Sequence, residues 1–135
     1  MRCLSISPKS GAMKPWLIIA GLAGALAVAL GAMAAHVAEA EAAHRLETAV
    51  RYLMWHALAL LGVTWLATTG ARRWANLAGG LFLSGMVLFC GTLAFSALSG
   101  HQALTLLAPA GGLAFIAGWL ALALAGLRWR SQNPG

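Results

Sequence analysis

Residues 16–35 read WLIIAGLAGALAVALGAMAA, an uninterrupted apolar stretch that contains no charged side chain. An α-helix of about 20 mainly apolar residues is long enough to cross a hydrocarbon core of about 30 Å. Three further apolar runs follow, at residues 52–69, 77–98 and 103–127. The sequence therefore predicts an all-α, polytopic membrane protein built as a bundle of four transmembrane helices.

The composition agrees with this architecture. Hydrophobic residues make up 61% of the chain and charged residues 9%, whereas a soluble domain has about 25% charged residues. Because the four runs leave little chain outside the membrane, we expect one domain over residues 13–130. Residues 1–12 are predicted to be a disordered extension, and residues 131–135 a flexible tail.

The basic residues are distributed unevenly around the four runs. The net charge is +6, and seven of the nine Lys and Arg residues precede the first run, separate the second from the third, or follow the fourth. Four spans place these three groups on one side of the membrane, which is the cytoplasmic side under the positive-inside rule. We therefore expect both termini in the cytoplasm and the lipid bilayer as the partner of these charges. Nucleic-acid binding is not expected, since no basic face alternates with exposed aromatic residues.

The N-terminal segment resembles a secretory signal that ends in Ala32-Met33-Ala34. The apolar run is longer than the 7–15 residues typical of such a signal, and cleavage would leave only three spans. We therefore expect the first helix to be retained. Met13-Lys14-Pro15-Trp16 also has the form of a conventional start, so we expect translation to begin at Met13.

Four further local features are expected. Residues 40–51 are predicted to form a short external helix running into the second span, because Glu41–Arg45 and Glu47–Arg51 are pairs spaced by four. Ala27, Gly31 and Ala35 recur every four residues and predict close helix packing in lipid. Pro109 is expected about two turns into the fourth helix, where it would produce a kink. Trp65 and Trp119 are expected to pack inside the bundle.

A polar and backbone-irregular cluster is expected in the external half of the bundle. Two interpretations are open: the groups satisfy one another and hold the helices together, or they bind a ligand, a metal or a proton, since ionisable residues within spans are candidates for function. The predicted members are His36, Tyr52, His56, Cys90, Thr92, Pro109, Gly111 and Gly112.

The sequence contains few of the residues and motifs that catalysis requires. The chain has no Asp, and its three Glu residues all lie in the external segment. A Ser-His-Asp triad, a phosphate-binding loop and a Cys-x-x-Cys pair are all missing from the sequence. His36, His56 and Cys90 have side chains that suit copper or zinc, but they follow no ligand-spacing motif. We expect no enzyme activity, no cofactor and no metal.

Four motifs resemble the transmembrane protein 256 family (domain of unknown function 423). GAMAAH at residues 31–36 is similar to the GAxxAH of that family, and TAVRYLMWHAL at 48–58 to its TAxxYxxxHAL. LFCGTL at 88–93 is similar to its LFSGSL, and PAGG at 109–112, followed by Gly118-Trp119, to its TPxGG…GW. The resemblance runs from about Met13 to Leu127 and implies a four-helix bacterial inner-membrane protein with mitochondrial relatives and no established activity.

Several positions depart from the pattern of the family. Cys90 and Thr92 replace two serines, Ala108 replaces the Thr before the Pro, and Val37 replaces the Gly after the His. We therefore do not expect a mechanism that depends on all of those hydroxyls. The motifs fall on the same cluster that residue spacing selects.

Two functional hypotheses follow from the sequence. The first is an integral inner-membrane protein that acts without catalysis, as an accessory or assembly partner of another membrane protein, or as a homo-oligomer. Its small size and small-residue helix faces favour this hypothesis. The alternative is a carrier or sensor that binds a small ligand, an ion or a metal at the cluster around His56.

Overall fold

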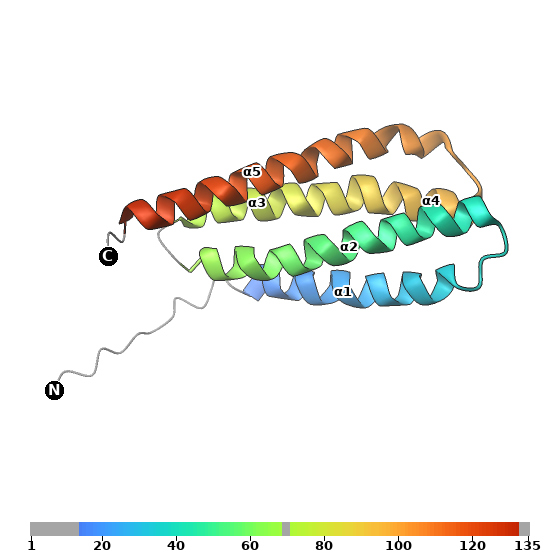
Figure 1. The fold of residues 1–135 in the computed structure, drawn as a ribbon, viewed down its shortest axis with the longest axis horizontal. Coiled ribbons are helices and arrows are strands. Elements are labelled where there is room, and N and C mark those ends of the chain that lie inside the picture. Colours follow the sequence, from blue (N-terminus) through green and yellow to red (C-terminus); the bar gives the residue numbers. More distant parts are fainter. Residues whose placement is uncertain (1–13, 69–70, 133–135) are drawn as a thin grey trace.

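The computed structural model describes residues 14–68 and 71–132, which form helices arranged as four long rods (Figure 1). The third rod is continuous through α3, a π-helix and α4, and the fourth joins a 3₁₀ helix to α5. The elements are α1 (Lys14–Ala34), α2 (Ala40–Leu66), α3 (Arg72–Gly85), the π-helix η1 (Met86–Gly91), α4 (Thr92–Ser99), the 3₁₀ helix η2 (Ala103–Leu107) and α5 (Ala108–Gln132).

Each rod is long and apolar enough to cross a membrane, which confirms the predicted all-α bundle of four spans. The spanning stretches are Pro15–Ala34, Ala40–Leu66, Arg72–Ser99 and Ala103–Arg128. The predicted external helix over residues 40–51 is also present, as the first half of α2, which runs into the second span without a break. Residues 131 and 132, predicted as tail, belong to α5. The predicted extension 1–12 and residues 133–135 lie outside the described residues.

Figure 1 shows α1 beside α2 and α5 beside the α3–η1–α4 rod, with α2 facing that rod between them. The start of α1, the start of α3 and the end of α5 lie at one end of the bundle. This arrangement follows from the even number of spans and gathers Arg72, Arg73 and Arg128 at that end. The cytoplasmic location of this end stays a prediction from the charge asymmetry.

Helix α2 occupies the centre of the bundle. Of its spanning window 44% is buried, compared with 22% for α1, which is therefore the helix most exposed to lipid. Buried residues recur along α2 at alternating intervals of four and three, the spacing of helices that pack side by side at a small angle. They include Ala42, Leu46, Ala49, Leu53, His56, Leu60 and Val63.

Helices α3 and α5 pack by exchanging aromatic rings and glycines. The Phe82 ring of α3 lies over Gly118 of α5, where an added Cβ would stand 2.6 Å from Phe82 Cδ1. The Phe115 ring of α5 lies over Gly85 of α3, where an added Cβ would stand 2.4 Å from Phe115 Cδ1. Each glycine therefore forms the recess into which the ring of the facing helix fits, and the two backbones approach closely.

Helix α1 contacts α3 near its start and packs on α2 further along. Trp16 lies over Gly79 of α3 and donates its indole N–H to Asn76 Oδ1 at 3.0 Å. Ala27 is fully buried and Gly31 lies near Val50 of α2. The predicted ridge is wrong at Ala35, which is exposed just beyond the end of α1. The buried face continues instead through Ala20, Ala23 and Ala34.

Pro109 lies six residues into the fourth span, where the 3₁₀ helix gives way to the α-helix, and the kink expected there stays a prediction. Pro109 is the second residue of α5, and the turn before it is the 3₁₀ helix η2. A proline in the first turn of a helix removes no intrahelical hydrogen bond, because the N–H groups there have no partner within the helix. Pro109 therefore helps to begin α5.

The third span contains an irregularity that the sequence did not indicate. Residues 86–91 form the π-helix η1, which inserts an extra residue between α3 and α4. If residues 86–91 were α-helical, the residues of α4 would be rotated about the helix axis and a different side of α4 would face α2. The π-helix therefore sets which side of α4 packs against α2.

The glycine recess on α5 leads to a prediction. Gly118→Ala should destabilise the protein by about 1–3 kcal/mol, because the added methyl group overlaps the Phe82 ring. Gly126→Ala, on the same helix but facing open space, should leave stability unchanged or raise it by up to about 1 kcal/mol. Thermal unfolding of the two variants in one detergent, followed by circular dichroism, measures the difference. Equal unfolding temperatures would contradict the packing described.

Candidate functional site

His56 lies at the middle of α2 and points into the bundle, with 4% of its surface exposed. Its position follows from the four–three spacing of buried residues on α2, which places it on the face turned toward α3 and α5. It is buried at the mid-length of the spans, whereas the sequence placed the cluster nearer the external surface.

Both imidazole nitrogens of His56 are hydrogen-bonded. Nδ1 lies 2.7 Å from the backbone oxygen of Tyr52, and the indole N–H of Trp119 donates to Nε2 at 3.2 Å. An indole nitrogen can only donate, so Nε2 must be the acceptor. Nδ1 therefore carries the proton and donates it to the Tyr52 carbonyl, which defines one tautomer of the neutral ring.

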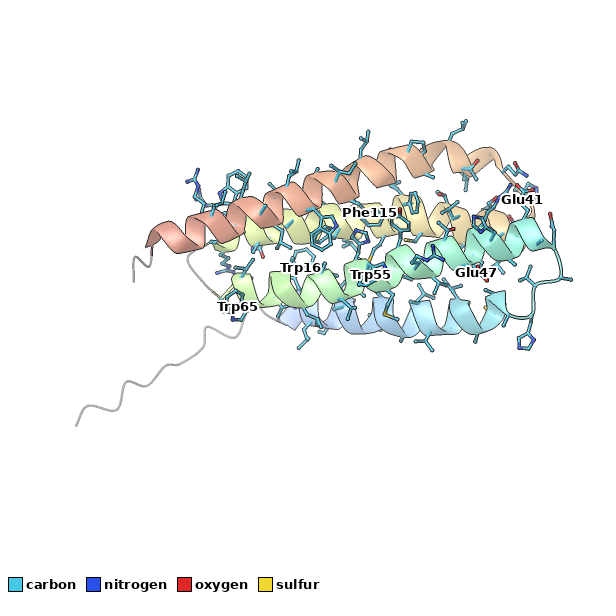
Figure 2. The ribbon with its side chains drawn as sticks, in the orientation of Figure 1. Trp16, Glu41, Glu47, Trp55, Trp65 and Phe115 are labelled. Atoms are coloured by element: carbon cyan, nitrogen blue, oxygen red, sulfur yellow. The ribbon has the colours of Figure 1, made fainter. Side chains whose placement is uncertain are left out.

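Aromatic rings enclose the imidazole from two helices. The Phe115 ring stacks on it with centroids 3.6 Å apart and an interplanar angle of 11°. The Phe82 ring approaches at 5.3 Å and 55°, and Trp119 at 6.0 Å and 57°. Figure 2 shows Phe115 in the interior of the bundle, away from the end that carries Glu41 and Glu47. The site is thus an apolar box with one polar ring inside it.

Tyr52 forms the rim of this box, one turn along α2. Its ring lies 4.8 Å from the Phe89 ring of η1 and 6.1 Å from the Phe115 ring. With 41% of its surface exposed, Tyr52 reaches from the aromatic interior to the lipid-facing surface.

Thr92 and Gly111 both contact the backbone of the π-helix. The Thr92 hydroxyl donates to the carbonyl of Leu88 at 2.6 Å and lies 3.2 Å from that of Phe89, which satisfies oxygens in a stretch of altered register. Gly111 of α5 lies against the same backbone, since an added Cβ there would stand 2.5 Å from the Phe89 nitrogen. The two residues allow α5 to pack directly on η1.

The other predicted members lie elsewhere. Cys90 is buried within the apolar core, and its neighbour Gly91 is exposed on the lipid-facing side. Pro109 is exposed in the first turn of α5, and a Cβ added at Gly112 would meet open space. His36 is exposed in the connection between α1 and α2. Of the eight predicted residues, the structure thus brings Tyr52, His56, Thr92 and Gly111 to the contact of α2, η1 and α5.

The metal hypothesis is not supported by the geometry of the described residues. His36 precedes the start of α2, and His56 lies about 24 Å along that helix from Ala40 at 1.5 Å per residue. Within residues 14–68 and 71–132, His, Cys, Asp and Glu form no group of three or more that could hold a metal ion. His36, His56 and Cys90 therefore do not form one site.

Sequence reasoning missed the aromatic partners of His56 and Tyr52. Phe82 and Phe115 contact His56, and Phe89 contacts Tyr52. These three residues carried no signal of their own, although glycines at 85, 111 and 118 lie opposite them. Trp119 was expected to pack inside the bundle and does so only in part, since it bonds to His56 while 49% of its surface is exposed. The same expectation is wrong for Trp65, of which 57% is exposed.

A second polar contact lies at the far end of the bundle. Arg45 donates from Nη1 to Ser96 Oγ at 3.1 Å and pairs through Nη2 with Glu41. Ser96 is almost completely buried on α4. The predicted Glu41–Arg45 pair therefore also joins α2 to α4, a role that spacing within one helix could not indicate.

These features define a four-helix, multi-pass integral membrane protein in which His56 and Ser96, two of the buried polar residues, are bonded to side chains of other helices. The chain matches the family model described as "Protein of unknown function (DUF423)" over residues 30–112, a range that includes His56, Thr92 and Gly111. The chain belongs to this family, as its motifs predicted.

Curated relatives cover nearly the whole chain. A UPF0382 membrane protein of Staphylococcus epidermidis is 36% identical over 87% of this chain and 98% of its own length. A UPF0382 membrane protein of Haemophilus influenzae is 33% identical over 86% and 96%. The UPF0382 inner membrane protein YgdD of Escherichia coli is 34% identical over 87% and 92%. These names confirm the predicted membrane location, and no solved structure matches the chain.

The closed environment of His56 predicts a large effect on stability. His56→Ala should destabilise the protein by about 3 kcal/mol, because it leaves a cavity among packed rings. Trp119→Phe should cost about 1 kcal/mol, because it removes the only donor to Nε2 while keeping a ring in place. His44→Ala changes an exposed residue of the same helix and should shift stability by less than about 0.5 kcal/mol. Denaturation in mixed micelles compares the three, and a His56→Ala protein as stable as His44→Ala would contradict this structural role.

The π-helix yields a separate prediction for Thr92. Thr92→Val keeps the shape of the side chain but removes the hydroxyl, so it should destabilise the protein by about 1 kcal/mol. Thr92→Ser retains the donor and should lie closer to the unsubstituted protein. Unfolding in the same micelles measures both, and a Thr92→Val protein at least as stable as Thr92→Ser would show that the hydroxyl does not support η1.

Proposed function

We propose that this protein is a non-enzymatic accessory or assembly protein that works by lateral association with another membrane protein. The observation that carries the proposal is the closed state of the interior. Both nitrogens of His56 are bonded, and every buried side-chain nitrogen or oxygen atom among the described residues has a hydrogen-bond partner. The bundle interior therefore offers a substrate or an ion little to bind.

The placement of the acidic residues supports the same proposal. The chain has only three acidic side chains, Glu39, Glu41 and Glu47, all at or near the start of α2. Proton-coupled transport and acid–base catalysis in membranes commonly use carboxylates within the spans. Nothing of this kind lies beside His56, whose neighbours are aromatic rings and one carbonyl.

The lipid-facing side of α1 is the surface on which a partner helix is expected. Gly21, Ala25, Val28 and Ala32 are all exposed and follow one another at intervals of four, three and four, so they share one face. Small residues on a lipid-facing helix allow a second helix to approach closely. Because the bundle buries only a small fraction of α1, this face is available to a partner helix.

The alternative function, a carrier or sensor at His56, is supported less well. A ligand at the imidazole would have to displace Trp119 from Nε2 or enter between rings stacked 3.6 Å apart. The alternative makes a different prediction: His56→Ala would abolish binding of a small ligand while the fold is retained.

A matched pair of glycine variants tests the proposal. Gly21 and Gly62 both face open space, so a leucine at either position should leave the bundle intact, but only Gly21 lies on the small-residue face of α1. We expect the protein, gently extracted from its own membrane, to carry one defined second membrane protein in native mass spectrometry. Gly21→Leu should reduce that complex at least tenfold, whereas Gly62→Leu should leave it unchanged.

Three other results of the native mass spectrometry experiment would overturn the proposal or move its site. A bare protomer or a homo-oligomer alone would contradict an accessory role. A small-molecule increment that disappears in a folded His56→Ala protein would establish the carrier function instead. Equal loss of the complex in Gly21→Leu and Gly62→Leu would place the association away from α1.

A further inference from the structure

A groove of about 560 Å³ opens toward lipid between α1 and the η1–α4 part of the third rod. Leu53 of α2 lies in its wall, Leu22 and Leu26 line it from α1, and Val87, Gly91 and Ala94 line it from the third rod. All of its lining residues are apolar, apart from Cys90. The groove lies on a different side of α1 from the Gly21–Ala25 face.

The groove lies where α1, which packs mainly on α2, diverges from the third rod beyond their contact at Trp16. Near the start of α1, Trp16 bonds to Asn76 and covers Gly79. Further along, Gly91 presents no side chain, and a Cβ added there would meet only the Met86 carbonyl, at 3.9 Å. The two rods are therefore closed together at Trp16 and leave a recess beyond it.

The length and lining of the groove suit a hydrocarbon chain. Its wall on α1 extends from Ile19 to Leu30, about 16 Å at 1.5 Å per residue. Its lining is apolar along this length, so an alkyl chain lying in it contacts carbon atoms on either side.

The charges at the closed end indicate which lipid supplies the chain. Arg72 shares a face of α3 with Asn76, Gly79 and Leu83, at intervals of four, three and four, and Leu83 lines the groove. Arg72 and the adjacent Arg73 are exposed. No Asp or Glu side chain lies at that end, because all three acidic residues are on the first half of α2 or just before it. An anionic headgroup complements this end of the bundle.

We propose that the groove binds one acyl chain of an anionic phospholipid whose phosphate lies at Arg72 and Arg73. Trp16 lies between these two parts of the site, at the depth where amphipathic rings meet lipid headgroups. On α3 the groove begins at Leu83, about 16 Å along the helix from Arg72, so a chain that starts at the headgroup level passes Trp16 before it enters the groove. This site goes beyond the accessory function and does not depend on it.

The test uses full-length protein in detergent and two phospholipids with the same chains, palmitoyl-oleoyl phosphatidylglycerol and palmitoyl-oleoyl phosphatidylcholine. Native mass spectrometry with each lipid counts the molecules retained per protomer. We expect one phosphatidylglycerol to be retained at least tenfold more strongly than phosphatidylcholine. Replacing Arg72 and Arg73 together by Gln should lower phosphatidylglycerol retention to the phosphatidylcholine level.

Groove variants separate chain binding from headgroup adsorption. Gly91→Leu fills the recess, whereas Gly62→Leu adds the same side chain at a lipid-facing position outside it. We expect Gly91→Leu to abolish retention of both lipids and Gly62→Leu to leave it unchanged, with equal unfolding temperatures. Val87→Trp narrows the same groove from an exposed position and serves if Gly91→Leu fails to fold.

Two results would overturn this assignment. If phosphatidylglycerol stays bound to folded Gly91→Leu and Val87→Trp proteins, the headgroup alone is adsorbed and the groove is not the site. If the arginine variant retains the original lipid preference, the chain is not selected by an anionic headgroup at that end. Neither result affects the Gly21 complex, so failure of the lipid site and failure of the accessory function are distinguishable.

Discussion

The hydrogen bond from Trp119 to His56 is the interaction on which the centre of this bundle depends. In a hydrocarbon environment no water is present to satisfy a polar group, so each one must find its partner within the protein. The imidazole meets this demand with one nitrogen bonded to the carbonyl of Tyr52 and the other to the indole of α5. Because α2 is central and α5 packs mainly on the third rod, this polar contact ties α5 directly to the central helix.

The aromatic and glycine residues around that contact determine how closely the rods approach. Phe82 on Gly118 and Phe115 on Gly85 bring α3 and α5 together, and Gly111 brings α5 onto the π-helix. The Phe115 ring that fills the Gly85 recess also stacks on His56. The polar contact and the close packing are therefore parts of one arrangement, in which Gly85 and Gly118 leave the space that aromatic rings occupy and Gly111 lets two backbones meet.

The exterior of α1 carries two separate lipid-facing features. Its small-residue face supports association with a partner helix, whereas the groove on another side is lined by apolar residues and runs toward the end of the bundle that carries Arg72 and Arg73. Both features arise because α1 packs mainly on α2 and meets the third rod chiefly at Trp16. A helix with little contact inside its own bundle has surface left for lipid and for other proteins.

The sequence by itself determined the number of spans, the helical class and the separation of charge between the two ends. These properties depend on the hydropathy, charge and length of each segment, which can be summed from the sequence without knowing any tertiary contact. It also selected Tyr52, His56, Thr92 and Gly111 for the centre, since polar residues and glycines stand out in an apolar span.

Only the tertiary structure decided that Trp119 is the partner of His56, that residues 86–91 form a π-helix, that Pro109 begins α5 and that Cys90 borders a groove. In lipid the inward and outward faces of a helix are equally apolar, so hydrophobicity does not distinguish them. The shapes of side chains on neighbouring helices make that choice.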